Sequence, residues 1–204
     1  MTALAPTRPT ACLALADGTL FYGAGFGATG QTVAELCFNT SMTGYQEIMT
    51  DPSYAGQIVT FTFPHIGNTG VNAEDDETAD PVAEGMVVKW NPTTPSSWRS
   101  AGPLGEWLAA RGRIAIGGID TRRLTRVLRV AGAMPGAFGT AAEPVLRAAA
   151  AAERGTAGVN LVAQVTTAQR YTVGSGALSV VAIDYGIKQS ILRCMAADAT
   201  VHVL

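Results

Sequence analysis

The chain has 204 residues, of which 48% are hydrophobic and 15% charged, and its formal net charge is −2. This composition is typical of a globular protein with a large buried surface, and it excludes a disordered chain. The balanced charge provides no basic field that would attract nucleic acid, and no apolar run is long enough to cross a membrane. With about 100–200 residues per domain, we expect one large domain or one domain with part of a second.

Five segments in the first half have the alternation, or the β-branched and aromatic content, of strands. They are residues 11–16, 19–23, 32–38, 57–63 and 85–90. Asp17-Gly18 between the first two is a strong hairpin signal, and the composition of the fourth favours a central strand. Residues 1–10 lack the pattern of a signal peptide, and we interpret them as a flexible tail.

A polar segment, FNTSMTGYQE, occupies residues 38–47 between the third and fourth strands. Loops of this kind on a rigid scaffold often carry ligand contacts. Thr43-x-x-Gln46 matches a capping box, which predicts a helix that begins at Gly44 and ends by Asp51, before Pro52. Five polar residues either line a groove or, as we favour, cap this helix and close a turn: Asn39, Thr40, Ser41, Thr43 and Gly44.

An acidic run, Glu74-Asp75-Asp76-Glu77, follows a glycine-rich loop at residues 64–72. The loop has neither the spacing nor the lysine of a Walker motif. We interpret the acidic run as an exposed loop, because clustered carboxylates without partner cations repel one another. Its spacing does not match a calcium-binding loop.

Three helices are predicted, at residues 103–111, 121–131 and 141–154, with a brief strand at 114–116. Asp120 is placed to cap the second helix and Gly132 to end it. This helix carries four arginines: Arg122, Arg123, Arg126 and Arg129. They form either a solvated basic face or a surface that docks a partner protein, and the sequence favours neither.

The pattern changes near the C-terminal end. Residues 168–178 contain Gly-Ser-Gly and are interpreted as a linker. Residues 180–183 predict a fully buried strand of a parallel sheet, followed by a helix at 187–197 and a strand from 201. Because this β-α-β unit stops at its second strand, residues 179–204 are expected either to be poorly ordered or to pack against another copy.

The cysteines are few and far apart, at Cys12, Cys37 and Cys194. This pattern favours a reducing cytoplasm over a disulfide framework, and it suggests no metal site. Cys194 falls inside a predicted helix and is expected to be a packing residue. Of the two histidines, His202 lies in the final predicted strand, and His65 lies in a Pro-His-Ile-Gly turn and is interpreted as a residue that fixes this turn.

Four strings resemble the small subunit of glutamine-dependent carbamoyl phosphate synthetase: FNTSMTGYQEIMTDPSYAGQIVTFTFPHIGNTGVN, GIDTRRLTRVLRVAGAMPG, NLVAQVTTAQRY and VVAIDYGIKQSILR. The resemblance covers almost the whole chain, from residue 11 to 204. It implies an α/β protein with a swivelling β/β/α N-terminal domain at residues 11–167. It also implies that residues 179–204 are the truncated start of a class I glutamine amidotransferase domain.

The resemblance further implies a cytoplasmic heterodimer, or a higher oligomer, with a large synthetase subunit. The small subunit hydrolyses L-glutamine, and its ammonia travels to the large subunit, which uses ATP, magnesium and bicarbonate for arginine and pyrimidine biosynthesis. No cofactor or metal is expected in this chain. The family's cysteine nucleophile lies in Gly-x-Cys-x-Gly, which this chain lacks, so we expect no glutamine hydrolysis by these residues alone.

One family role falls on a single residue. Ser53, in Asp51-Pro52-Ser53-Tyr54, matches the serine that the N-terminal domain lends to the glutamine site. Its hydroxyl can bond the amino and carboxylate groups of an amino acid, although a local turn bond is the alternative. The four arginines are candidates for the large-subunit interface.

Three functional hypotheses remain open: a subunit of a glutamine-using enzyme, a non-catalytic module that only docks the large subunit, and a small-molecule binder built on residues 180–204. A complete sequence with Gly-x-Cys-x-Gly downstream would favour the first of them. The third would need ligand binding by an incomplete sheet.

Overall fold

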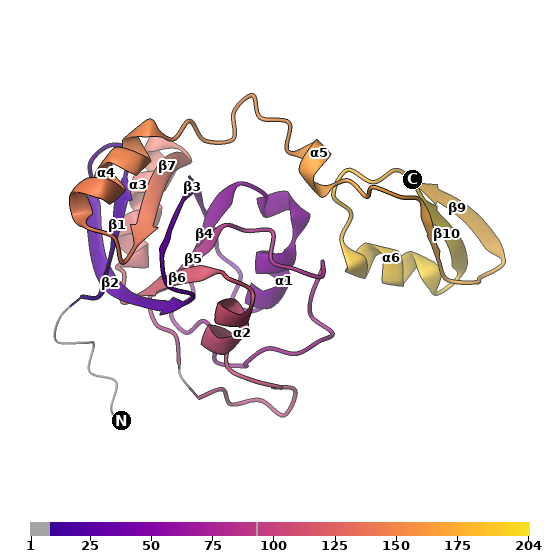
Figure 1. Cartoon of the computed structure of the whole chain (residues 1–204). Coiled ribbons are helices and arrows are strands. Elements are labelled where there is room, and N and C mark those ends of the chain that lie inside the picture. Colours follow the sequence, from indigo (N-terminus) through magenta and orange to yellow (C-terminus); the bar gives the residue numbers. More distant parts are fainter. Residues whose placement is uncertain (1–8, 93) are drawn as a thin grey trace.

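The computed structural model describes residues 9–92 and 94–204. They form a larger unit built on a closed sheet and a smaller C-terminal unit, with an extended segment between them (Figure 1). The expectation of a mixed α/β protein is confirmed. Of the predicted tail at residues 1–10, the first eight residues lie outside the described part of the chain.

The sheet of the larger unit contains seven described strands. They are β1 (Ala11–Leu15), β2 (Leu20–Gly27), β3 (Gln31–Asn39), β4 (Gln57–Phe61), β5 (Gly85–Val87), β6 (Ile114–Gly117) and β7 (Met134–Gly139). Their order around the closed sheet is β1-β2-β6-β5-β4-β3-β7. β3, β4, β5 and β6 run parallel to one another, and the other neighbours are antiparallel. The predicted central strand, β4, therefore lies between two parallel neighbours.

The predicted hairpin is confirmed. Ala14 lies opposite Leu20, and Gly18 in the turn has a φ of 86°, a left-handed conformation that glycine adopts without a steric penalty. The Asp17 side chain accepts a hydrogen bond of 2.8 Å from the Thr19 N–H and closes the turn.

β7 closes the sheet by pairing with both β1 and β3, and the sequence did not predict it. Its residues MPGAFG lack strand-like alternation. Close packing requires the glycine at 139, because its φ is 151° and an added Cβ would lie 2.1 Å from the Gly30 carbonyl oxygen. The glycines of β7 thus have two effects: they remove the alternation by which a strand is predicted, and they let three strands approach one another.

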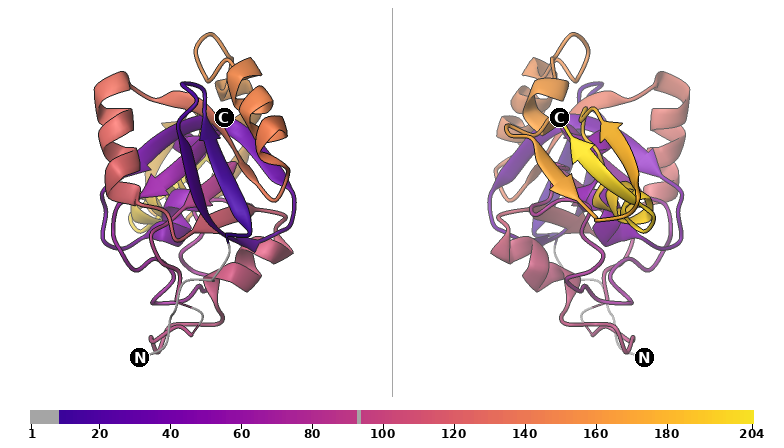
Figure 2. Two further views of the ribbon diagram at one scale, coloured as in Figure 1. Left: turned by 90° about the vertical axis from the view of Figure 1, so that its left-hand side faces the viewer. Right: turned by 90° about the vertical axis from the view of Figure 1, so that its right-hand side faces the viewer.

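Four α-helices and one 3₁₀ helix belong to the larger unit: α1 (Tyr45–Thr50), η1 (Pro52–Tyr54), α2 (Leu104–Ala110), α3 (Thr121–Ala131) and α4 (Glu143–Ala152). In the views of Figure 2, α3 and α4 lie on opposite sides of the closed sheet. Leu124 and Leu128 of α3 are buried in one core cluster, and Leu146 of α4 is buried in another. As predicted, the Asp120 side chain caps α3 by accepting from the Arg123 N–H, and Gly132 ends it.

The C-terminal unit comprises α5 (Val162–Val165), β8 (Tyr171–Val173), β9 (Leu178–Ala182), α6 (Gln189–Ala196) and β10 (Ala199–Val203). β10 lies between β8, which is antiparallel to it, and β9, which is parallel (Figure 2). The segment predicted as a linker, 168–178, therefore includes a strand of this sheet. Residues 179–204 pair within their own chain, which differs from the poorly ordered segment expected as one alternative. Packing against a second copy stays a prediction.

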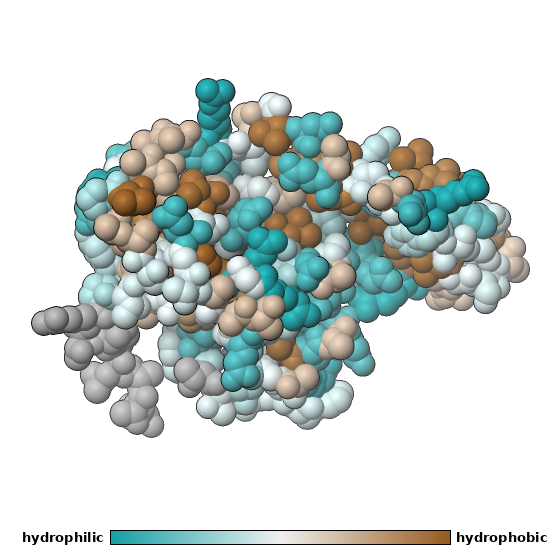
Figure 3. Space-filling model, viewed as in Figure 1, coloured by the Kyte–Doolittle hydropathy of each residue, from teal (hydrophilic) through white to brown (hydrophobic). Residues whose placement is uncertain are grey.

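The parallel pairing of β9 is confirmed, but its predicted full burial is wrong. Val181 and Ile183, which directly follows the strand, are each more than 60% exposed, because no described element covers this face of the sheet, and Leu178 at the start of β9 is exposed as well. Hydrophobic surface is visible on this unit at the right-hand end of Figure 3. The opposite face packs on α6 and buries Leu192 and Val201. Within the described ranges, no helix has the length and apolar character needed to span a membrane.

Candidate functional site

Ser53 lies in η1, a single turn that directly follows α1. The Asp51 side chain caps this turn by accepting a hydrogen bond of 2.9 Å from the Ser53 N–H. Ser53 is exposed, and no hydrogen bond joins its hydroxyl to any residue in the described part of the chain. The local turn bond expected as the alternative role thus uses the main chain of Ser53 and leaves its hydroxyl free.

The turn that carries Ser53 contacts the C-terminal unit through Asp51 and Pro52. Lys188 Nζ lies 3.6 Å from Asp51 Oδ2. Gly186 lies so close to Pro52 that an added Cβ would be 3.0 Å from the Pro52 Cβ. Ser53 therefore stands at a junction between the two units, beside the loop that links β9 to α6.

The β9–α6 loop is fixed by a buried carboxylate. Asp184 is 5% exposed and accepts hydrogen bonds from the N–H groups of Thr167, Gly186 and Ile187, at 2.8, 2.7 and 2.8 Å. A carboxylate with three backbone donors is well satisfied although it is buried. Asp184 thereby holds the loop in one conformation opposite the Ser53 turn.

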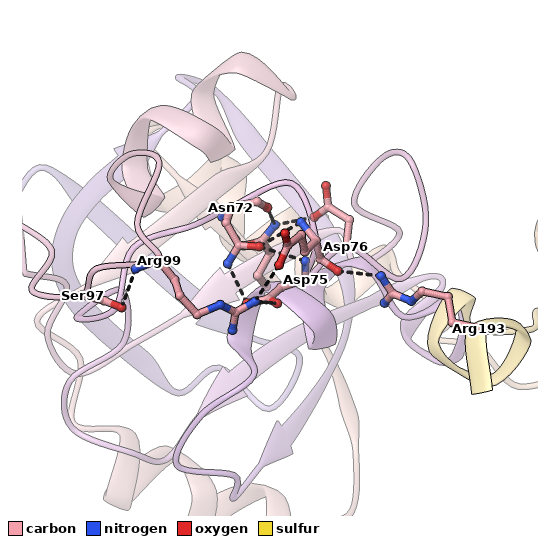
Figure 4. A network of polar contacts seen from close by, with 8 residues as sticks. Asn72, Asp75, Asp76, Ser97, Arg99 and Arg193 are labelled. Atoms are coloured by element: carbon pink, nitrogen blue, oxygen red, sulfur yellow. Dashed lines mark hydrogen bonds and ion pairs between the residues drawn. The ribbon is translucent and has the colours of Figure 1, made fainter. Parts of the chain in front are cut away.

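The acidic run 74–77 is exposed as predicted only at Glu74, and its other carboxylates are at least partly buried and have hydrogen-bonding partners (Figure 4). Arg99 lies 2.6 Å from Asp75 and 3.4 Å from Glu74, and Arg111 lies 3.5 Å from Asp76. Glu77 is 6% exposed. No local pattern predicts these cations, because they lie more than twenty residues further along the chain.

The predicted capping box at Thr43 and Gln46 is also wrong. The N-cap of α1 is Gly44, with a φ of 80° and no side-chain cap. The Gln46 side chain points away from its own helix. It donates to Asp76 Oδ1 at 2.7 Å and accepts from the Asn72 N–H at 3.0 Å. Tertiary partners thus satisfy the glutamine that the local motif assigned to the helix start.

A polar pocket of about 260 Å³ opens beside the acidic run, lined by residues that include Thr43, Gln46, Glu47, Asn72 and Arg99. Burial, followed by the charges of Asp75 and Glu77, raises the pKa of the Glu47 carboxyl. The polar groove considered in the sequence is therefore present. Of the five residues predicted to line it, only Thr43 and Gly44 do so. Asn39 and Ser41 instead close a turn, in which the Ser41 N–H donates to Asn39 Oδ1 at 2.7 Å.

The four arginines of α3 are all exposed, as both hypotheses for them required. None has a carboxylate partner within 4.0 Å in the described part of the chain. Arg123 stacks over Phe21, with its guanidinium carbon 4.8 Å from the ring centroid. Arg122, Arg123 and Arg126 also border an open hollow of about 570 Å³. The face therefore presents unpaired positive charge.

The thiols and imidazoles do not assemble into a catalytic site. Cys12 and Cys37 lie in β1 and β3, and Cys194 is exposed on α6, which corrects the packing role expected for it. His65 packs edge-on against Trp90 at 4.6 Å, consistent with a residue that fixes a turn. Among residues 9–92 and 94–204, no group of three His, Cys, Asp or Glu side chains is placed to hold a metal ion.

Residues 13–138 match the family model described as carbamoyl-phosphate synthase small chain, CPSase domain. The chain belongs to this family. Within the family, the small chain of Ruegeria pomeroyi is 61% identical over 214 residues, which cover 94% of this chain and 54% of that protein. The small chain of Mesorhizobium japonicum is 49% identical over 217 residues, covering 95% and 54%.

The chain thus spans about half the length of these curated members of the carbamoyl-phosphate synthase small-chain family. Among solved structures, an aminopeptidase from Aneurinibacillus sp. strain AM-1 aligns with 98% of this chain at 12% identity and a TM-score of 0.36. A similarity at that level supports no conclusion about fold or function. The family membership rests on the sequence matches.

Proposed function

We propose that this chain is part of the small subunit of a glutamine-hydrolysing carbamoyl phosphate synthase. The subunit would supply ammonia from glutamine to a large subunit that makes carbamoyl phosphate from bicarbonate and ATP, for arginine and pyrimidine biosynthesis. Residues 11–167 would be the swivelling β/β/α N-terminal domain. Residues 179–204 would begin the class I amidotransferase domain, in which the cysteine nucleophile and its histidine and glutamate partners would lie.

The observation that carries this proposal is the position of Ser53. Its hydroxyl is exposed and unpaired, and the residues on its N-terminal side contact the first loop of the C-terminal unit. A family role that needs a serine at the boundary of two domains is therefore supported by the local geometry. A hydroxyl can donate to the carboxylate of glutamine and accept from its ammonium group at the same time.

Ser53 would orient the substrate and take no part in bond breaking. The hydrogen bond from its N–H to Asp51 fixes the turn, so the backbone that carries the hydroxyl is in place before glutamine arrives. The large subunit would hold ATP and magnesium. The unpaired arginine face of α3 supports a docking role toward that subunit, and a cytoplasmic location stays a prediction.

The test uses the complete small chain assembled with its large subunit. Ser53→Ala is expected to raise the KM for glutamine by roughly tenfold, the effect of losing about one good hydrogen bond to a charged group. Synthesis from added ammonia should persist, because ammonia does not need the glutamine site. Ser175→Ala changes another exposed serine, in the C-terminal unit, and serves as the matched control.

Unchanged glutamine kinetics in Ser53→Ala would remove the substrate role. The alternative function, a module that docks the large subunit without catalysis, is favoured only by the free arginine face. It predicts that the complete protein binds the large subunit but releases no glutamate from glutamine. Measuring glutamate release by the assembled complex therefore separates the two functions.

A further inference from the structure

Glu77 belongs to the larger unit and makes three direct hydrogen bonds, two of which connect it to the C-terminal unit. Its N–H donates to Thr50 Oγ1 at 2.8 Å. Its carboxylate accepts from the Ser190 N–H at 2.8 Å, and its main-chain carbonyl accepts from the Gln189 N–H at 3.1 Å. The first contact lies in the larger unit and the other two lie in the C-terminal unit. The side chain is only 6% exposed, so these contacts are largely shielded from water.

The contacts to α6 satisfy a need that its own sequence leaves unmet. The first N–H groups of a helix have no partner inside the helix, and the helix dipole favours a negative charge there. The residue at the N-cap of α6 is Lys188, which makes no side-chain cap bond. Glu77, from a loop more than one hundred residues earlier, supplies the acceptors instead. The start of α6 is therefore capped by the other unit.

The bonded groups adjoin the two segments that meet at the candidate site. Thr50 is the last residue of α1 and directly precedes the turn that carries Ser53. Gln189 directly follows the β9–α6 loop, whose Gly186 touches Pro52. Arg193, one turn further along α6, donates to the Glu74 carbonyl at 2.8 Å, and Figure 4 shows its side chain reaching from α6 to the acidic run.

We infer that Glu77 is a positioning residue for the glutamine site: it fixes the β9–α6 loop relative to the Ser53 turn and does not itself touch the substrate. The inference rests on the function proposed above. Without the Glu77 carboxylate, the two segments would separate more often, and the fraction of molecules with a binding-competent site would fall. A smaller competent fraction weakens apparent substrate affinity in proportion.

The activity test again uses the complete small chain with its large subunit. Glu77→Ala is expected to raise the KM for glutamine by roughly tenfold, with a smaller effect on kcat. Glu77→Gln keeps an acceptor for the Ser190 N–H and should restore most of the affinity. Synthesis from ammonia should stay within about twofold in both variants, since it does not use this junction.

Glu74→Ala is the matched control. Its carboxylate belongs to the same acidic run, but that side chain is 82% exposed. The bond that Glu74 makes to α6 uses its main-chain carbonyl, which alanine retains. This variant should therefore leave the KM for glutamine unchanged.

A second variant guards against misfolding caused by loss of the buried carboxylate. Gln189→Pro removes the N–H that donates to the Glu77 carbonyl and leaves Glu77 intact. Proline is well tolerated at the first position of a helix. It also favours an extended conformation in the residue before it, and Lys188 already has that conformation. We expect a rise in KM smaller than that of Glu77→Ala but larger than that of the control.

Amide hydrogen exchange measures the junction without reference to activity. In the chain of residues 1–204, Glu77→Ala should speed exchange at Ser190 and its neighbours by roughly tenfold, and Glu74→Ala should not. Unchanged exchange overturns the inference. So does an unchanged KM in both Glu77→Ala and Gln189→Pro when Ser53→Ala raises it. If Ser53→Ala has no effect, the proposed substrate role fails, while the exchange result still decides whether Glu77 holds the junction.

Discussion

Gly186 and Pro52 lie in direct contact across the junction of the two units. An added Cβ on Gly186 would lie 3.0 Å from the Pro52 Cβ and 2.9 Å from Val165 Cγ2. Gly186 also has a φ of 100°, a conformation that side chains rarely adopt. Both the space and the backbone therefore require glycine at this position.

Gly186→Ala is expected to destabilise the packing of the C-terminal unit by about 2 kcal/mol or more, from backbone strain and overpacking together. Urea unfolding, with amide hydrogen exchange at residues 184–190 as the readout, would measure this loss of stability. Gly158→Ala is the control, because Gly158 has a φ of 77° but no atom within 4 Å of an added Cβ. It should lose only the strain, about 1 kcal/mol. Equal losses in both variants would contradict the close contact.

Asp51 is predicted to matter for stability, in contrast to the Ser53 hydroxyl beside it. Asp51→Ala removes the cap of η1 and the partner of Lys188, and should cost about 1 kcal/mol in the free energy of unfolding. Asp51→Asn keeps a capping side chain and should cost less, since a partly exposed ion pair contributes little. Ser53→Ala should be neutral within about 0.5 kcal/mol. Urea denaturation of the three variants checks this order.

The elements predicted correctly are those whose signals are local. The hairpin at Asp17-Gly18 needs a left-handed glycine next to a short polar residue, and the start of α3 needs the Asp120 side chain three residues before its N–H donor. The β4 strand carries enough β-branched and aromatic residues to identify itself. In each case neighbouring residues supply the interaction that fixes the backbone, so a sequence pattern can represent it.

The features that could not be predicted depend on partners distant in sequence. Gln46 matches a local capping motif but bonds Asn72 and Asp76 instead. The acidic run appears repulsive until Arg99 and Arg111 are placed beside it. Glu77 is buried because α6 docks on it. That helix lies more than one hundred residues further along the chain, so no local sequence pattern includes both. Tertiary contacts decide these cases against the local preference.

The three thiols should differ sharply in reactivity. Burial is the main cause that raises the pKa of Cys37 to about 12, and it also raises the pKa of Cys12, whereas Cys194 is exposed. Because the thiolate is the reactive form, a disulfide reagent at pH 8 should label Cys194 rapidly and leave the other two unmodified until the protein unfolds. Cys194→Ser should remove the rapid phase. Rapid labelling of that variant would place a second thiol at the surface.

The raised pKa of Cys37 also predicts a loss of stability at high pH. The pKa is 9.0 for an unperturbed thiol and about 12 in the folded chain, so the unfolded state loses its proton first as the pH rises. The contribution of the neutral thiol is fully present below about pH 9 and is lost between about pH 9 and 12. Cys37→Ala, which cannot ionise, should show a smaller decline over that range. If the free energy of unfolding declines equally with pH in both proteins, the raised pKa of Cys37 is contradicted.

Charge reversal on α3 tests the role of its arginine face. Arg122→Glu combined with Arg126→Glu should leave the fold intact within about 1 kcal/mol, since both side chains are exposed and have no carboxylate partner within 4.0 Å in the described structure. If the face docks an acidic surface of the large subunit, the double variant should reduce association by at least tenfold, mainly in low salt. Arg154→Glu reverses one charge, half of the change in the double variant, on an exposed residue outside α3 and should associate normally. Co-purification and binding to the large subunit, measured at two salt concentrations, test this docking role. If the arginine face is only solvated, the double variant and the control should associate equally well.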